Sequence, residues 1–154
     1  MLPQKTVNGI TLNIRHTMLP VSNMERTIDF YTRLLCMDIQ RIRDVPERNE
    51  RVRYLGYGIE DEGPSLELIE SSESRGKASL PRWIGHIALY VSDCYKLSEK
   101  LKAEGVEFVS GPAPNRPGSK DIYAFIKDPD GYVIELTERH GTSGGVPKRS
   151  GEKG

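Results

Sequence analysis

Cysteine and histidine are scarce in this sequence, and no long apolar run occurs in it. The two cysteines, Cys36 and Cys94, lack the close spacing of a disulfide framework or a metal-binding motif. The longest apolar runs, such as residues 87–91, have the length of a strand and are too short for a membrane-spanning helix or a signal peptide. We therefore expect a reduced, cytoplasmic protein that needs no membrane as a partner.

An excess of charge of either sign is also missing. The 22 Lys and Arg residues balance 22 Asp and Glu residues, so nothing favours nucleic acid as a partner. The length of 154 residues suits one domain or two small fused modules. Residues 1–13 and 139–154 have little apolar periodicity, so we expect an N-terminal extension and a flexible tail there.

An internal repeat organises the rest of the chain. The segment HTMLPVS at residues 16–22 recurs 70 residues later as HIALYVS at residues 86–92, with His, Val and Ser in register. Each copy ends in a segment that carries a Glu between aliphatic residues, Glu67 in the first and Glu135 in the second. The His-to-Glu separation is 51 residues in the first copy and 49 in the second, which indicates a duplicated structural unit.

Each copy predicts the same order of elements: a strand with the His, a helix and three more strands. The expected fold is therefore α+β, with two βαβββ modules in one domain of residues 14–138. We expect the modules at residues 14–70 and 82–138, joined by a polar linker at residues 71–81.

Capping and turn residues set the expected bounds of these elements. The first helix is expected to begin with a capping box from Ser22 to Glu25. The second is expected to begin at Ser92 or Asp93 and to end at Gly105. Further strands are expected at residues 38–42, 52–57, 65–70, 106–110, 122–126 and 132–137, with a tight turn at 128–131.

The alternation of side chains along a strand predicts a metal site. The aliphatic neighbours of Glu67 and Glu135 should face the core under the helix, which sends both carboxylates to the uncovered face of the sheet. His16 and His86 lie opposite the apolar residues of their own strands, so we expect them on that same face. Two imidazoles and two carboxylates suit a divalent first-row metal with open positions for water or substrate oxygens.

Six segments of the chain carry a family resemblance. They are HTML from residue 16, TIDFY from 27, LGYG from 55, LEL from 66, GHIA from 85 and AFIKDPDGYVIEL from 124. Together they resemble glyoxalase I, the lactoylglutathione lyase of the vicinal oxygen chelate (VOC) superfamily. The resemblance runs from about residue 14 to residue 138.

The resemblance implies the glyoxalase/bleomycin resistance/dihydroxybiphenyl dioxygenase fold, in a homodimer whose sites combine modules of different chains. Pairing of the modules within one chain stays open. The metal ligands that it implies are His16, Glu67, His86 and Glu135. The short stretch between Arg43 and Tyr54 resembles the compact bacterial type, often activated by nickel or cobalt, although zinc also stays open.

The implied reaction converts the hemithioacetal of methylglyoxal and a thiol, glutathione or an analogue, to the lactoyl thioester, a detoxification of methylglyoxal. The metal would act as a Lewis acid that stabilises the enediolate. A carboxylate would remove the proton from C1 and return it to C2, with Glu135 as the base for one hand of the substrate and Glu67 for the other.

Two positions depart from the glyoxalase I pattern. Pro20 stands where the family has an Arg four residues after the first ligand, and Ser71 stands where it has an Asn four residues after the second. Neither can form the bidentate, charged clamp that binds glutathione carboxylates. Arg82, Arg116 and Lys120 lie near positions where members carry glutathione-contacting cations, and with Ser71 they are the candidate substrate contacts.

Four other residues stand outside the expected site. Glu70 and Glu138 fall on the opposite face from the ligands and are expected to be solvated. His140, at the start of the tail, is expected to be incidental. Cys36 occupies the place where relatives carry the Gly that ends the first helix.

Other functions on the same scaffold stay open. An acyl-CoA epimerase of this superfamily usually has Gln where Glu67 stands, and fosfomycin thiol transferases and extradiol dioxygenases generally use three protein ligands. A different metal-dependent isomerase with a non-glutathione substrate is the main alternative. A small-molecule-binding resistance protein is the remaining one, although such proteins tend to lose the metal ligands.

Overall fold

A computed structural model of the chain describes residues 6–7, 10–11, 14–60, 63–77 and 85–140. The chain forms two compact units, residues 1–84 with 128–132 and residues 85–127 with 133–154. In the predicted N-terminal extension, the two-residue strands β1 (Thr6–Val7) and β2 (Ile10–Thr11) pair antiparallel. Residues 78–81 of the expected linker, residues 82–84 of the expected second module and residues 141–154 of the expected tail lie outside the described residues.

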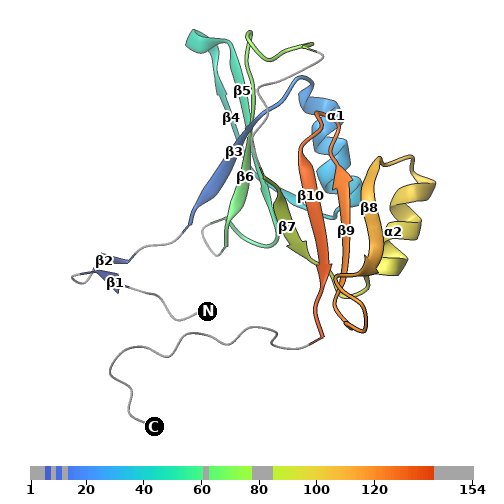
Figure 1. The fold of residues 1–154 in the computed structure, drawn as a ribbon. Helices are drawn as coiled ribbons and strands as arrows, with labels where there is room; N and C mark the ends of the chain where they lie inside the picture. The colour runs from blue at the N-terminus through green and yellow to red at the C-terminus, as the bar shows by residue number, and fades with distance from the viewer. Residues whose placement is uncertain (1–5, 8–9, 12–13, 61–62, 78–84, 141–154) are drawn as a thin grey trace. The chain divides into compact units, whose positions relative to one another are not determined.

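The first unit contains one four-stranded sheet with the strand order β3-β6-β5-β4 (Figure 1). Strands β3 and β6 are parallel, and the other neighbours are antiparallel. Its elements are β3 (His16–Pro20), α1 (Met24–Asp29), the π-helical turn η1 (Phe30–Leu34), β4 (Asp38–Val45), the 3-10 turn η2 (Pro46–Arg48), β5 (Glu50–Gly56) and β6 (Ser65–Glu70).

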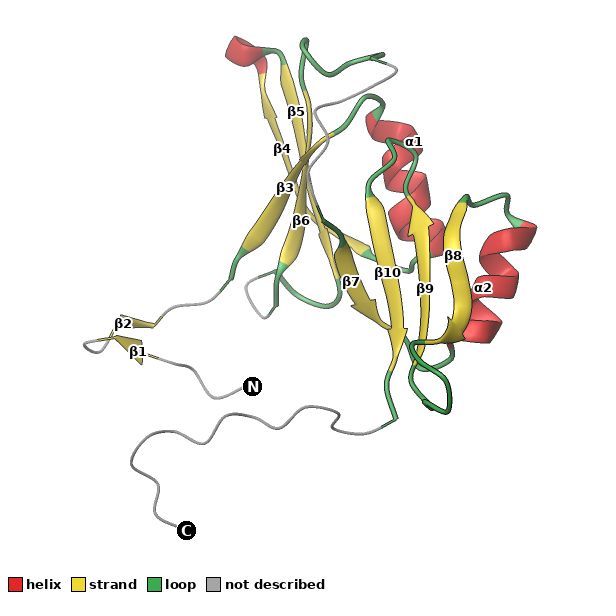
Figure 2. Ribbon diagram, viewed as in Figure 1, coloured by secondary structure: helices red, strands yellow, loops and turns green. Residues whose placement is uncertain are grey.

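The second unit repeats this plan with the strand order β7-β10-β9-β8. Its elements are β7 (Ile87–Tyr90), α2 (Cys94–Ala103), β8 (Phe108–Pro114), β9 (Ile122–Lys127) and β10 (Val133–Glu138). Figure 2 shows α2 lying along its sheet. The matching orders confirm the predicted α+β fold of two βαβββ modules. Among the helices that the structure describes, none is long and apolar enough to span a membrane.

The core forms on one face of each sheet, as the alternation predicts. In β6, Leu66 and Leu68 are buried while Glu67 between them is partly exposed. In β10, Ile134 and Leu136 are fully buried in the same way. The apolar residues thus direct the Glu of each final strand to the opposite face of the sheet.

The predicted capping box at the first helix is wrong. Asn23 is the N-cap residue, and its side chain accepts a hydrogen bond of 2.9 Å from the backbone N–H of Arg26. The hydroxyl of Ser22 instead donates to Oδ1 of Asp130, 2.5 Å away. The Ser22 side chain is directed to this carboxylate, a strong acceptor, and Asn23 caps the helix one residue later. At the second helix Asp93 is the N-cap residue, one of the two predicted candidates.

The prediction that Glu70 and Glu138 are solvated is also wrong. Glu70 is only 4% exposed, and its Oε2 accepts a 2.7 Å hydrogen bond from the backbone N–H of Met24, the first residue of α1. In the second unit, Oε2 of Glu138 accepts a 2.7 Å bond from the N–H of Cys94, the first residue of α2. The first-turn N–H groups of a helix lack intrahelical partners, so each last strand satisfies one of them.

Two residues after the helices have a left-handed backbone conformation. Cys36, which follows the first helical segment, has a φ of 56°, in the left-handed region that favours Gly. Gly105 takes the matching place after α2 with a φ of 78°, as predicted. The predicted turn at residues 128–131 forms, with the N–H of Gly131 bonded to the carbonyl of Asp128 at 2.9 Å.

Candidate metal half-sites

Each unit brings one predicted imidazole and one predicted carboxylate together. In the first unit, Nε2 of His16 lies 3.1 Å from Oε2 of Glu67. The parallel pairing of β3 with β6 places them there, because Met18 is opposite Glu67 and His16 lies two residues before Met18 on the same face. The imidazole is 34% exposed and the carboxylate 13%, so the pair is open to solvent from the His side.

The second unit repeats the arrangement. Nε2 of His86, the residue just before β7, lies 2.6 Å from Oε2 of Glu135 in β10. These side chains are 44% and 12% exposed, close to the values in the first unit. The same two atom types therefore converge in both copies, with the same partly exposed imidazole.

An aromatic ring packs edge-on against each imidazole. In the first unit this ring is that of Tyr54 on β5. Its centroid lies 5.7 Å from the centroid of the His16 ring, and the angle between the two ring planes is 70°. In the second unit it is the ring of Phe125 on β9. Its centroid lies 5.6 Å from the centroid of the His86 ring, and the angle between the two ring planes is 80°. The rings restrict the rotamers of both histidines and so hold Nε2 toward the carboxylate.

The first half-site has one polar contact that finds no match among the described residues of the second. The phenol of Tyr54 donates a short hydrogen bond to Oε1 of Glu67. Burial raises the pKa of Tyr54, and the hydrogen bond to Glu67 and its charge raise it further, while Arg41 opposes them. The phenol thus keeps its proton and acts as the donor. Sequence reasoning missed Tyr54, because only the strand register shows which residue lies opposite Glu67.

The donor chemistry of the half-sites fits a divalent metal, but each supplies only half of a ligand set. An imidazole nitrogen and a carboxylate oxygen are ligands that nickel, cobalt and zinc accept. Among the residues that the structure describes, no group of three or more His, Cys, Asp or Glu gathers in one place. Neither half-site alone therefore supplies the four donors that the sequence predicts.

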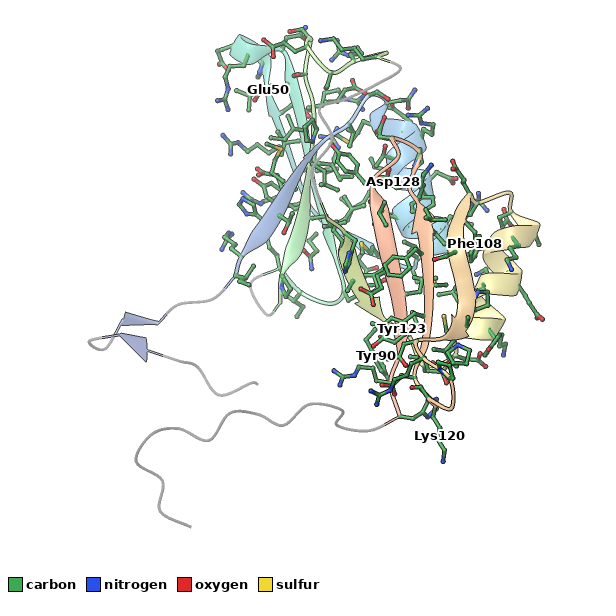
Figure 3. The ribbon with its side chains drawn as sticks, viewed as in Figure 1. Glu50, Tyr90, Phe108, Lys120, Tyr123 and Asp128 are labelled. Atoms are coloured by element: carbon green, nitrogen blue, oxygen red, sulfur yellow. The ribbon has the colours of Figure 1, made fainter. Side chains whose placement is uncertain are left out.

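The predicted substrate contacts that the structure describes make no bond to the His–Glu pair of their own unit. Arg116 and Lys120 are exposed in the loop between β8 and β9, and Figure 3 shows Lys120 at the same end of the sheet as Tyr123. Within residues 85–140 no hydrogen bond or ion pair joins either cation to His86 or Glu135. Ser71 bonds locally, since its backbone N–H donates to Oγ of Ser74 at 2.9 Å. Arg82 lies outside the described residues.

His140 also has a local partner. Its Nε2 lies 2.5 Å from Oε1 of Glu138, the carboxylate that bonds to the start of α2. The ring is 47% exposed. His140 is thus paired with Glu138 and not with Glu135.

A separate cavity of about 550 Å³ opens in the first unit near the start of α1. Three cations in its lining are paired: Arg26 with Asp130, Arg51 with Glu25, and Arg75 with Glu70. The four predicted ligands are not among its lining residues. The cavity is therefore lined by ion pairs around the start of α1 and is not part of the half-sites.

Comparisons with known proteins match both units. The model of the Glyoxalase/Bleomycin resistance protein/Dioxygenase superfamily matches residues 13–136. The lactoylglutathione lyase of Neisseria meningitidis serogroup B is 36% identical over 128 residues, which cover 83% of this chain and 91% of the relative. The lactoylglutathione lyase of Escherichia coli O157:H7 is 36% identical over 135 residues, with 88% and 98% covered.

Solved structures show the same likeness. The trypanothione-dependent glyoxalase I of Leishmania major has a TM-score of 0.71 at 35% identity, over 82% of this chain and 86% of that one. Glyoxalase I from Zea mays has a TM-score of 0.75 at 34% identity. The match covers 84% of this chain and 45% of the maize chain.

Proposed function

The chain belongs to the glyoxalase/bleomycin resistance protein/dioxygenase superfamily and is a glyoxalase I-like lyase, and on that premise we propose that it converts the hemithioacetal of methylglyoxal and a thiol to the lactoyl thioester. The observation that carries this proposal is the repeated pair of a His Nε2 and a Glu Oε2, at 3.1 Å in one unit and 2.6 Å in the other.

The proposed metal ligands are these same residues, His16, Glu67, His86 and Glu135. A divalent ion held there, nickel, cobalt or zinc, would supply Lewis-acid stabilisation of the negative charge that develops on the substrate oxygens. Both carboxylates are partly buried beside a partly exposed imidazole, so they can interact with a bound substrate while the surrounding strands fix their positions.

The carboxylates also move the proton. In this isomerisation the proton leaves C1 of the hemithioacetal and is returned to C2, so no external acid or base is consumed. Glu135 is the proposed base for one hand of the substrate and Glu67 for the other. A carboxylate in this place acts as acid and base in turn, which typically contributes about 10²–10⁴-fold to the rate.

We propose further that the enzyme is a cytoplasmic homodimer in which one half-site of each kind forms a complete site. Support comes from the division of the four donors, two in each unit. The free thiols of Cys36 and Cys94 suit a reducing compartment. Sedimentation of the full chain tests the assembly, and full activity in a monomer would contradict the dimer.

The thiol is the open part of the reaction. Pro20 and Ser71 replace the polar residues that the family places beside glutathione, and the similar Leishmania major enzyme is trypanothione-dependent. A thiol adduct other than that of glutathione is therefore the second candidate substrate. Comparing glutathione with trypanothione on the same preparation separates the two.

The direct test is turnover by the metal-loaded chain. Nickel, cobalt or zinc is added in turn, methylglyoxal is supplied with each thiol, and the thioester is followed by its ultraviolet absorbance. We expect turnover with at least one metal, and a loss of about 10²-fold or more in Glu135→Gln.

The matched control is Glu99→Gln, which makes the same change at an exposed position on α2 and should keep full activity. No thioester with any of the three metals and either thiol would refute the proposed reaction.

A further inference from the structure

The two half-sites differ at one atom that bears on function. Strand register sets Tyr54 opposite Glu67 in the first unit and Phe125 opposite Glu135 in the second. The rings otherwise do the same work, because both pack edge-on against the imidazole at centroid distances of 5.7 and 5.6 Å. The internal repeat thus provides a comparison in which the ring next to the imidazole is kept and its hydroxyl group is not.

The neighbouring strand extends the difference. Arg41 lies opposite Tyr54 on β4, and its guanidinium carbon stacks 3.8 Å from the centre of the Tyr54 ring. The guanidinium also reaches Glu60, with Nε 2.9 Å from Oε1. In the second unit Ser110 lies opposite Phe125, and a serine cannot stack on a ring. Among the described residues, a cation therefore stacks on the ring of Tyr54 and none stacks on the ring of Phe125.

The two carboxylates therefore differ in how many of their oxygens are bonded. Oε2 of Glu67 faces His16 while Oε1 accepts the phenol hydrogen of Tyr54, so both oxygens are engaged. Oε2 of Glu135 faces His86. Within residues 85–140, no other side chain donates a hydrogen bond to Glu135, so it can turn about its own χ angles at lower cost.

We propose that Tyr54 is a positioning residue whose phenol orients Glu67 as a metal ligand, and that Phe125 leaves Glu135 without this restraint. This inference rests on the proposed function and deepens it, because it makes two carboxylates of one repeat unequal. Partners in hydrogen bonds to metal ligands orient those ligands, and their loss typically lowers metal affinity or activity by about 10–100-fold.

Reciprocal variants test the inference. Tyr54→Phe should fold, since Phe125 shows that the ring packs on the imidazole without the hydroxyl. Calorimetric titration of the full chain with Zn²⁺ should show an affinity about 10–100-fold below that of the unmodified chain. Phe125→Tyr should keep or raise the affinity and lower kcat with little change in KM. Tyr95→Phe, which removes an exposed hydroxyl on α2, should change neither quantity.

The outcomes separate this inference from the proposed reaction. Equal Zn²⁺ affinity of Tyr54→Phe and the unmodified chain, or an unchanged kcat in Phe125→Tyr, would overturn the role of Tyr54 even in an active lyase. If the unmodified chain binds Zn²⁺ but forms no thioester, the reaction fails, and the affinity of Tyr54→Phe still decides whether the phenol fixes Glu67.

Discussion

The phenol of Tyr31 donates a 2.9 Å hydrogen bond to Oδ2 of Asp128 in the buried interior of the first unit. Backbone N–H groups of Asp130 and Tyr132 donate to Oδ1 of the same carboxylate, each at 2.9 Å. Burial nevertheless raises the pKa of Asp128 from 3.8 to about 6, because these hydrogen bonds only partly offset the loss of water.

The raised pKa gives a pH dependence of stability. The unfolded chain releases this proton near pH 3.8 while the folded chain keeps it to about pH 6. The favourable contribution is therefore full below the unfolded pKa and is lost as the pH rises through the folded pKa, by about 3 kcal/mol in all. Asp128→Asn should remove this slope in urea unfolding between these pH values.

The control for that series is Asp38→Asn, an exposed position at the start of β4. Its stability should follow the pH dependence of the unmodified chain. If Asp128→Asn also keeps the full slope, the buried carboxyl is not its source.

The variant Glu70→Gln should lower the stability of the folded chain, although it replaces only one oxygen atom by an amide nitrogen. Glu70→Gln removes the charge that faces Arg75 at 2.8 Å and weakens the bond to the N–H of Met24. Because the side chain is buried, the cost in free energy of unfolding should be about 1–3 kcal/mol in urea titrations. Glu73→Gln, at an exposed position, should change little, and equal stability of the two variants would exclude the role of Glu70 at the helix start.

Replacing Cys36 by Gly should make the folded chain more stable. A residue with a Cβ pays roughly 1 kcal/mol to hold a φ of 56°, whereas Gly does not. Cys36→Gly should therefore raise the free energy of unfolding, by somewhat less than that amount because Gly also adds freedom to the unfolded chain. Cys36→Ala removes the same thiol but keeps the Cβ. A gain in both variants would assign the effect to the thiol and contradict the backbone explanation.

The sequence predicts much of this fold because both relevant patterns are local. Alternation in β6 and β10 sets the face of Glu67 and Glu135, and the repeat sets their common plan. Prediction from the sequence fails where the partner of a side chain is distant in the chain. The hydroxyl of Ser22 bonds to Asp130, 108 residues away, instead of capping the helix, and no local rule predicts that contact. Tyr54 reaches Glu67 through strand register, which hydrophobic alternation alone does not fix.

The central claim is that two half-sites complete one metal site, and metal stoichiometry tests it most directly. Metal content is measured after equilibrium dialysis of the full chain, His16→Ala and His86→Ala. We predict one ion per chain in the unmodified protein and nearly complete loss in each single variant, because either change leaves an incomplete ligand set. Two ions per chain, with one remaining in each variant, would show that the half-sites bind metal separately and would contradict the account.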